Sequence, residues 1–439
     1  MARKMKDSGI EWIGEIPEGW SVSKVLHCLS MPITDGPHTT PILYDTGIPF
    51  VSAEAVSCGN GRIDFSHIRG YISEQFYKEC CQKYVPEIDD IYMIKSGATT
   101  GRVAIVDTTR VFTIWSPLAV FRCNKDCMLP KFLYYYLQSP AFQKEVEFGW
   151  TFGTQQNVGM RSLEQMKVCV PQLNKQDTIA NYLDYQCTQI DLLLQKALTS
   201  IEEYKKLKQA VITQAVTKGV RGERVMKDSG NPWFGQIPTD WKLSRVGLHF
   251  SIILGKMLCN APLNDTYTLE PYYCAADVHF DGVADGERKK MWFSPIEKDL
   301  YRVSVGDLLV VEGGAGAGGS AIVENQDSYT YIQNSIMIVR SKGNTNNRYL
   351  RYLLEFLVKQ GYIDIVCNKA TIPHFTKDKL SCVPFCLCPT GEQEEIADYL
   401  DAKCAEIDKL IAKKEQLVKE LESYKKSLIY EVVTGKREV

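Results

Sequence analysis

The 439-residue chain contains a tandem duplication, and this constrains its fold more than any other feature of the sequence. The segment Lys6–Trp20 recurs as Lys227–Trp241, with nine of 15 positions identical at an offset of 221 residues. Further along, 176–219 aligns with 393–436 without a gap at an offset of 217, with 16 identities in 44 positions. The chain is therefore two similar halves, each long enough to hold one or two domains.

Each half has the same order of segments: a Trp-bounded segment, a mixed globular body and a long charged helical segment. The bodies contain short β runs broken by Gly, Pro and Asn, such as 307–311, 320–323 and 335–340, and one short helix each, at 131–137 and 348–354. This mixture favours an α+β class over alternating βαβ units. The predicted division is a first body at 1–170, a central helical region at 171–220, a second body at 221–388 and a C-terminal helical region at 389–439.

The helical regions carry apolar residues at alternating three- and four-residue steps, which is a heptad pattern. The predicted seam consists of Ile190, Leu193, Ala197, Tyr204, Leu207 and Val211 in the first half and Ile407, Leu410, Leu417, Leu421, Tyr424 and Leu428 in the second. Ser200 and Lys414 interrupt this seam and are candidates for setting its register. Thr390 and Gln393 predict a capping box at the start of the later helix, with Asn174 and Asp177 as a weaker equivalent.

Two helices of about 40 residues, on the order of 60 Å long, suit pairing with each other better than burial in one globular core. If they pair antiparallel, the C-terminus returns to the first body, while the central helix leads directly into the second. We therefore expect two similar mixed bodies separated by two long antiparallel coiled-coil helices. The arrangement would be circularly closed, with a pseudo-twofold axis, and the helices would act as a ruler between the bodies.

Composition excludes several classes of protein. Lys plus Arg number 51 and Asp plus Glu 53, a net charge of −2, so binding of nucleic acid by bulk charge is not expected, although local basic residues remain possible. The 15 cysteines are scattered without a C-x-x-C pair, which predicts reduced thiols and no metal site. No apolar stretch is long enough for a membrane span or an export signal, so we expect a soluble, cytoplasmic protein.

Motifs of catalysis are missing. The glycines of the loop 312–320 match G-x-G-x-x-G, but a strand-like sequence follows where a dinucleotide site needs a helix, so a flexible hairpin loop is expected. The tetrad 231–234 is similar to the Asn-Pro-Pro-Tyr of adenine amino-methyltransferases, yet its counterpart 10–13 shows that it belongs to the repeated segment. No nucleophile, base and orienting group recur in both halves. A binding protein without its own catalytic residues is therefore the interpretation that the sequence favours.

Candidate binding residues lie in the parts of the bodies where the halves differ. Polar and basic loops there suit contacts with phosphates and base edges. The candidates are His38, Thr39, Thr40, Lys95, Thr99, Arg102, Thr154, Gln155, Gln156 and Asn157 in the first half and Lys256, Lys289, Lys290, Asn368, Lys369, Thr371 and His374 in the second. Two diverged surfaces on one frame indicate two different ligands, or two segments of one.

With these motifs in view, the whole chain resembles the specificity subunit of type I restriction–modification systems. The resemblance rests on the repeated Asp-Ser-Gly-x-x-Trp-x-Gly-x-Ile-Pro-x-x-Trp, the strand and Gly loop at 306–323, the Gln-x-x-Ile-Ala-x-Tyr-Leu-Asp motifs within 171–184 and 389–401, and the Ala-Val-Thr-Lys-Gly of 215–219. One departure is Asp89 where the second half has Gly306, which bears on the geometry of a turn.

The resemblance implies a non-catalytic subunit with two target-recognition domains. Each would read one half of a bipartite sequence in double-stranded DNA, and the helices would set the spacer. Two modification subunits would methylate adenine with S-adenosylmethionine, a cofactor of those partners and not of this chain, and restriction and translocase subunits would join them. Two alternatives stay open: a methyltransferase or nuclease acting alone, and a coiled-coil adaptor that joins proteins without a role on DNA.

Overall fold

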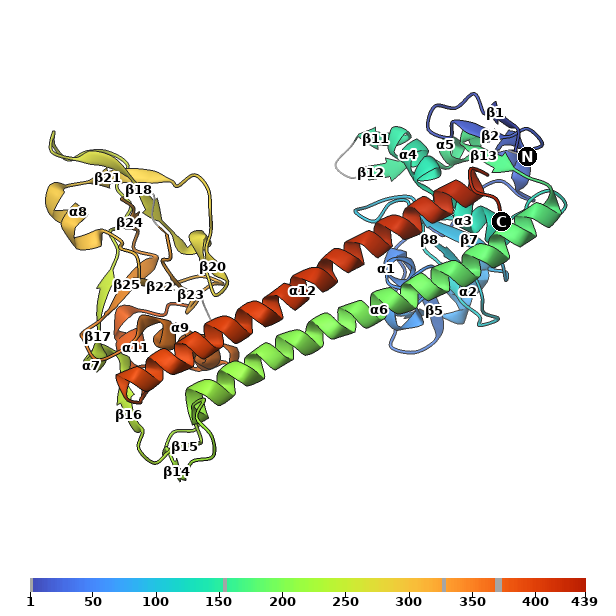
Figure 1. Ribbon diagram of the computed structural model, residues 1–439. Coiled ribbons are helices and arrows are strands. Elements are labelled where there is room, and N and C mark those ends of the chain that lie inside the picture. The colour runs from blue at the N-terminus through green and yellow to red at the C-terminus, as the bar shows by residue number, and fades with distance from the viewer. Residues whose placement is uncertain (1–2, 153–155, 326–328, 368–372) are drawn as a thin grey trace. The chain divides into compact units, whose positions relative to one another are not determined.

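The computed structural model describes residues 3–152, 156–325, 329–367 and 373–439 (Figure 1). The chain forms two compact units. Unit 1 comprises 1–198 together with 415–439, and unit 2 comprises 199–414. Both boundaries fall inside a long helix, so each unit is completed by a helical segment from the other half of the duplication.

Unit 1 is a mixed body of short strands and helices. Its strands are β1 (Met5–Asp7), β2 (Glu15–Pro17), β3 (Ser21–Lys24), β4 (Thr34–Asp35), β5 (Ile48–Val51), β6 (Tyr71–Ile72), β7 (Ile91–Ile94), β8 (Val103–Ile105), β9 (Thr113–Ile114), β10 (Leu118–Phe121), β11 (Trp150–Phe152), β12 (Gln156–Val158) and β13 (Lys167–Val170). Its helices are α1 (Ala53–Ser57), α2 (Glu74–Cys81), α3 (Pro130–Gln138), α4 (Pro140–Phe148), α5 (Met160–Gln165) and the first part of α6 (Leu173–Lys218).

Unit 2 follows the same plan. Its strands are β14 (Met226–Asp228), β15 (Gln236–Pro238), β16 (Lys242–Arg245), β17 (Phe250–Leu254), β18 (Thr268–Tyr273), β19 (Val278–His279), β20 (Gly282–Val283), β21 (Lys290–Phe293), β22 (Leu308–Val311), β23 (Ser320–Ile322), β24 (Tyr331–Ile332), β25 (Ile336–Ser341) and β26 (Pro384–Leu387). Its helices are α7 (Val246–His249), α8 (Pro295–Tyr301), α9 (Asn347–Lys359), α10 (Tyr362–Val366), α11 (Lys377–Cys382) and the first part of α12 (Thr390–Val433).

Each unit has its own pair of sheets, and the strand order within the sheets is the same in both units. An antiparallel four-stranded sheet has the order β4-β10-β7-β8 in unit 1 and β17-β25-β22-β23 in unit 2. A three-stranded sheet, β6-β5-β9 or β21-β18-β24, contains one parallel pair in each unit. The central strands β7, β10 and β22 are buried along their whole length, which explains their continuous apolar sequences. The mixed helix-and-strand class expected from the sequence is confirmed.

The long helices α6 and α12 run antiparallel within each unit. In unit 2, Lys208 Nζ donates to Asp408 at 2.7 Å, and Arg221, just beyond the end of α6, pairs with Glu395 at 2.7 Å. In unit 1 the Lys425 ammonium binds Asp191 at 2.6 Å. The offset of 217 relates Asp191 to Asp408 and Lys208 to Lys425. Each unit therefore contains the same Lys–Asp ion pair. In unit 2 the lysine belongs to α6 and the aspartate to α12, and in unit 1 the lysine belongs to α12 and the aspartate to α6.

The buried seam keeps the heptad spacing, and about half of the predicted positions lie in it. Ile190, Ala197, Ile407 and Leu428 are buried as expected, and Tyr204, Val211 and Leu421 are partly buried. Leu193, Leu207, Leu410, Leu417 and Tyr424 are instead exposed. At these steps the seam passes through the next residue along the chain, as at Leu194, Ile411 and Val418, and it likewise passes through Ile201 next to Ser200. Ser200 is thus not the weak point, because Ile201 fills that step, whereas Lys414 does lie in the seam and is partly buried. Adjacent apolar residues, such as those at 193–194 and 410–411, made the phase ambiguous.

The predicted capping boxes are wrong, because Asn174 and Thr390 lie inside α6 and α12 and not just before them. Gln393 does not reach back to cap α12; it is fully buried, its Oε1 accepts the Asn346 N–H at 2.9 Å and its Nε2 donates to the Cys388 carbonyl at 2.8 Å. Gln176, 217 residues earlier, accepts from the Leu129 N–H at 2.7 Å and donates to the Pro171 carbonyl at 2.9 Å. The repeated glutamine fastens the start of each long helix to the start of the body helix α3 or α9.

The turn before β7 and β22 has one geometry in both units. Gly306 has φ of 87° and Asp89 has φ of 75°, so the aspartate adopts the left-handed conformation that glycine supplies in the second copy. The Asp89 carboxylate binds Lys125 at 2.7 Å. The departure from the family pattern therefore leaves the turn unchanged.

Across the part of the chain that the structure describes, we find no helix with the length and apolar content needed to cross a membrane.

Candidate nucleic-acid interface

One end of the four-stranded sheet gathers the diverged loops of unit 1. Strands β4 and β7 both flank β10, with Ala119 opposite Asp35 on one side and Met93 on the other. Both strands are antiparallel to β10, so the loops that follow them, 36–47 and 95–102, leave the sheet at the same end. We call this end, with these two loops, the sheet end of unit 1.

The hairpin β11–β12 joins the same sheet end. Ser96 forms a bridge with Asn157, the Gly97 N–H donates to the Gln156 carbonyl at 3.0 Å, and the Val158 N–H donates to the Lys95 carbonyl at 2.8 Å. The side chains of Gln156 and Asn157 are exposed. The sequence separated these groups by some 60 residues, and the structure brings them together. Thr154 and Gln155 lie outside the described residues.

A buried carboxylate organises the cations of this sheet end. Asp35 is fully buried and contacts the ammonium groups of Lys83 and Lys95, the latter at 3.4 Å, and the His38 ring at 3.2 Å. The Lys83 side chain is 48% exposed and that of His38 72%, whereas Lys95 is only 13% exposed. Burial of a carboxylate is costly without such partners, so Asp35 holds the cations in place. Sequence reasoning missed Asp35 and Lys83, because no local pattern links two residues 48 positions apart.

The remaining candidates of unit 1 lie on the two loops. Thr39 and Thr40 are exposed on the loop after β4. Thr99 is half-buried, and its carbonyl accepts the Arg102 N–H at 3.2 Å in the turn between β7 and β8. Arg102 is exposed, and its guanidinium donates to the Ser57 carbonyl at 3.0 Å. Arg102 thus has a fixed backbone and a side chain anchored at one nitrogen.

Unit 2 builds its sheet end in the same way. Met337 of β25 lies opposite Leu254 of β17 on one side and Val310 of β22 on the other. The loops 255–267 and 312–319 therefore leave together, and His374 forms a bridge with Gly313. His374 is exposed and corresponds to Asn157 at the offset of 217. The Gly loop expected to be flexible is fastened here, since the Gly314 N–H donates to the Pro373 carbonyl at 3.2 Å.

Lys256 is not an accessible DNA contact, in disagreement with the sequence prediction. Its side chain is 10% exposed, its Nζ donates to Glu297 at 2.5 Å, and it lies over the Tyr267 and Phe293 rings. Burial raises the pKa of Glu297, but hydrogen bonds from Lys256 and Ser294 outweigh this effect and leave the pKa below its usual range. Lys256 is therefore a core cation.

The other candidates of unit 2 are divided between two places. Lys289 and Lys290 are exposed where β21 begins, and β21 belongs to the three-stranded sheet rather than to the sheet end. Asn368, Lys369 and Thr371 lie outside the described residues.

The scaffold beneath the sheet ends is duplicated, whereas the loops are not. Asp184 binds Lys131 at 2.5 Å and accepts from the Tyr135 hydroxyl at 2.7 Å. The equivalent Asp401 binds Arg348 at 2.5 Å and the Tyr352 hydroxyl at 2.7 Å. The loops differ at corresponding positions, with Lys95 and Asn157 in unit 1 against Glu312 and His374 in unit 2. One frame thus presents two chemically different surfaces.

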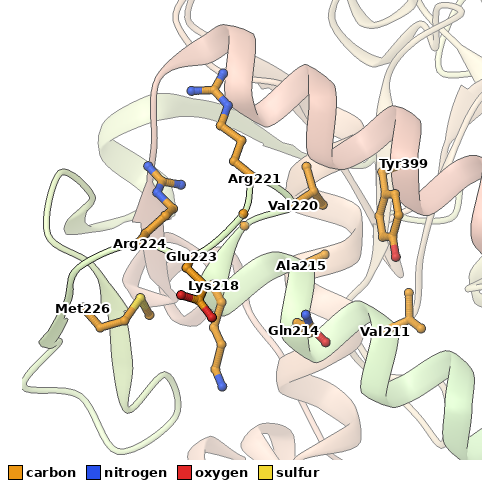
Figure 2. Close-up of a pocket in the computed structure, with 12 residues that line it drawn as sticks. Val211, Gln214, Ala215, Lys218, Val220, Arg221, Glu223, Arg224, Met226 and Tyr399 are labelled. Carbon is orange, nitrogen blue, oxygen red and sulfur yellow. The ribbon is translucent and has the colours of Figure 1, made fainter.

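A pocket of about 550 Å³ lies elsewhere in unit 2, at the end of α6 (Figure 2). Tyr399 of α12 lines one side, and the segment after α6, with Arg221 and Arg224, lines the other. Arg224 is bound by Glu392 and Asp240, and Arg221 by Glu395, so these cations are neutralised. None of the predicted binding residues line this pocket.

Among the described residues, we find no group of three or more His, Cys, Asp or Glu side chains placed to hold a metal ion.

The chain belongs to the family of the type I restriction modification DNA specificity domain. The model of that family matches it twice, over residues 39–203 and 239–420. Together these stretches cover most of the chain, one in each copy of the duplication. The resemblance inferred from the motifs is thereby confirmed.

Two solved structures share its fold. A chain from a structure described as the "Structural basis underlying complex assembly and conformational transition of the type I R-M system" aligns with a TM-score of 0.72 at 17% identity, covering 95% of this chain and 98% of that one. The HsdS subunit from Thermoanaerobacter tengcongensis aligns with a TM-score of 0.52 at 17% identity, covering 96% and 98%.

Proposed function

We propose that this chain is the DNA-binding specificity subunit of a type I restriction–modification complex, in which each sheet end recognises one half of a bipartite target. The observation that carries the proposal is that one duplicated frame presents different side chains at the same sheet end in each unit. A protein that recognised a symmetric site would have no need for two different surfaces. Two surfaces suit an asymmetric sequence in two parts.

The exposed groups of unit 1 are suited to direct readout. The amides of Gln156 and Asn157 can donate to N7 and accept from N6 of adenine in the major groove. Lys83 and Arg102 carry positive charge beside them and suit the phosphates, which position a protein without specifying sequence. In unit 2, His374 takes the place of Asn157. A different hydrogen-bonding group at the same position would select a different base.

The helices set the spacer between the two half-sites in this proposal. Both α6 and α12 continue without interruption from one unit to the other. The number of helical residues would then fix how far apart the two halves of the target lie. Because both ion pairs and the seam repeat at the same offset, the helices can lengthen or shorten by whole heptads without losing their pairing.

The chemistry belongs to partner subunits. Two modification subunits would bind this chain and methylate adenine with S-adenosylmethionine, after rotating the base out of the duplex. Restriction and translocase subunits would join the same core. In such a complex, this chain would select the DNA sequence and would take no part in breaking bonds.

The test is to co-express the full chain with the modification subunit encoded beside it, in a host without other DNA methylation, and to map methylated adenines across the genome. We expect a single gapped, asymmetric motif modified on both strands. A stable complex that leaves the genome unmethylated would contradict the proposal and favour a protein adaptor. Methylation by this chain without any partner would instead show an independent enzyme.

A further inference from the structure

Each unit has an arginine at the same place in its three-stranded sheet. Arg69 lies two residues before Tyr71 of β6, and Arg288 lies two residues before Lys290 of β21. Tyr71 and Lys290 are equivalent, because each lies opposite the proline that comes just before the central strand pairs in parallel with β9 or β24. The two arginines can therefore be compared directly, and their surroundings differ.

The Arg69 guanidinium lies at the sheet end of unit 1. Its central carbon is 4.9 Å from the centre of the Trp115 ring, and Trp115 directly follows β9. A Cβ atom at Gly36 would lie 2.7 Å from the Trp115 carbonyl carbon, so the loop after β4 passes over this residue. The Lys95 N–H donates to the Pro117 carbonyl at 2.8 Å, which fastens the other loop to the same turn. Trp115 and the arginine stacked on it thus lie beside both loops.

Glu54 fixes the orientation of this guanidinium. Its carboxylate accepts from Nε of Arg69 at 3.1 Å and from Nη2 at 2.9 Å. The buried Ser52 donates its hydroxyl to the same carboxylate at 2.5 Å. A carboxylate on one edge and an aromatic ring on one face leave the planar guanidinium little freedom to turn. Arg69 is thus preorganised, which reduces the entropy that its side chain loses when it binds a ligand.

One edge of Arg69 remains available. Glu54 takes the edge between Nε and Nη2, and among the described residues no partner binds Nη1, while the side chain is 48% exposed. Guanine presents two acceptors, O6 and N7, in the major groove, and the paired N–H groups of an arginine match both. Glu54 also neutralises the charge of Arg69. The arginine therefore suits these directional acceptors better than a phosphate, whose attraction depends on charge.

The equivalent arginine of unit 2 is closed off. Arg288 is only 16% exposed, and it lies over the Tyr273 ring at 4.8 Å. Its Nη1 donates to Asp277 at 3.3 Å, and its Nη2 donates to the Ala284 carbonyl. Both terminal nitrogens of Arg288 thus bind groups of their own unit, and they form the edge that Arg69 leaves available. The same place in the frame holds an internal contact in unit 2 and an open donor edge in unit 1.

We propose that Arg69 recognises a guanine in the half-site of unit 1, with Nη1 and Nη2 donating to N7 and O6. Glu54 and Trp115 hold the guanidinium in the plane of that base. Arg288 makes no such contact, so this guanine belongs to one half-site only. The inference rests on the proposed function and deepens it, because it names a base and the residue that selects it.

The experiment uses the full chain assembled with its modification subunits and duplexes that carry the mapped target. 7-Deazaguanine, which lacks the N7 acceptor, replaces the guanines one at a time, and binding is measured for the wild type and for Arg69→Gln. The methylated motif of each variant is mapped as well. Arg69→Lys keeps the charge but loses the planar pair of donors.

Two controls match the Arg69→Gln substitution. Arg62→Gln changes an arginine that is 74% exposed and bound to Asp107 at 2.7 Å, beyond β8 at the opposite end of the four-stranded sheet. Arg288→Gln changes the equivalent arginine of unit 2. Both controls should leave the methylated motif as it is in the wild type.

We expect one 7-deazaguanine position to weaken wild-type binding about tenfold and to leave binding by Arg69→Gln unchanged. Arg69→Gln should itself weaken binding to the unmodified target about tenfold to a hundredfold. Both Arg69→Gln and Arg69→Lys should relax the methylated motif at that one position and leave the other half-site intact.

Several outcomes would overturn the guanine contact and leave the proposed function standing. One is a wild-type complex whose binding no 7-deazaguanine weakens, a result that needs no variant to fold. Another is a methylated motif that Arg69→Gln leaves unchanged. A third is a loss of affinity that is equal for all sequences and lowers the salt dependence, which would show a phosphate contact. A wild-type complex that recognises no bipartite target would overturn both the inference and the proposed function.

Discussion

Gln393 offers a sharp test of how the duplicated frame is held together. Gln393→Met keeps the length of the side chain but removes both of its hydrogen-bonding groups. The Asn346 N–H and the Cys388 carbonyl, bound at 2.9 and 2.8 Å, would both lose their partner beside a fully buried side chain. Each unsatisfied buried group costs about 1–3 kcal/mol, so the substitution should destabilise unit 2 by about 3 kcal/mol.

For a unit of this size, 3 kcal/mol corresponds to a fall in Tm of about 6–12 °C. Calorimetry would measure the transition, and hydrogen exchange would assign it to a unit. Exchange should quicken in α9, whose first turn is capped by the Asn346 side chain, and not in α3. Gln176→Met should reverse the pattern, quickening exchange in α3 and not in α9.

The control is Gln416→Met, in which an exposed glutamine on α12 loses only a bond to Glu420. This variant should stay within about 0.5 kcal/mol of wild type. If Gln393→Met is no less stable than this control, the repeated glutamine is not a structural anchor and the reasoning fails.

Three further predictions concern charge and length. Lys83→Gln should lower the slope of log affinity for DNA against log salt by about one, measured by titration at several salt concentrations, whereas an unchanged slope would remove Lys83 from the phosphate contacts. Hydrogen bonds from Arg69, and then from Ser52, lower the pKa of Glu54 to about 2. This contribution to stability is present above pH 4.5 and is lost as the pH falls towards 2, so Arg69→Met should flatten the fall of the denaturation midpoint between pH 5 and pH 3. Inserting one heptad in both α6 and α12 should lengthen the spacer by about three base pairs, because it adds about 10 Å, and methylation mapping should find both half-sites unchanged.

The loops of the candidate interface could be located from the sequence, because aligning the two halves of the duplication shows which segments have diverged. His38, Lys95 and Asn157 do lie together at the sheet end, although the Lys95 side chain, bound to Asp35, is only 13% exposed. The prediction failed at Lys256, since the carboxylate that binds it lies 41 residues further along the chain. It also missed Asp35, because a lone aspartate in a polar loop carries no sign of burial.

The sequence by itself determined the duplication, the α+β class, the heptad spacing of the helices and the family. These follow from local periodicity and from the alignment of one half with the other, and neither needs knowledge of distant contacts. Only the tertiary structure decided which apolar row of each helix is buried and that the repeated glutamine anchors rather than caps. These outcomes depend on which surface of a distant segment each side chain contacts. Adjacent apolar residues such as Leu193 and Leu194 are equally suited to burial by their sequence, so only the packing of the folded chain determines which of them is buried.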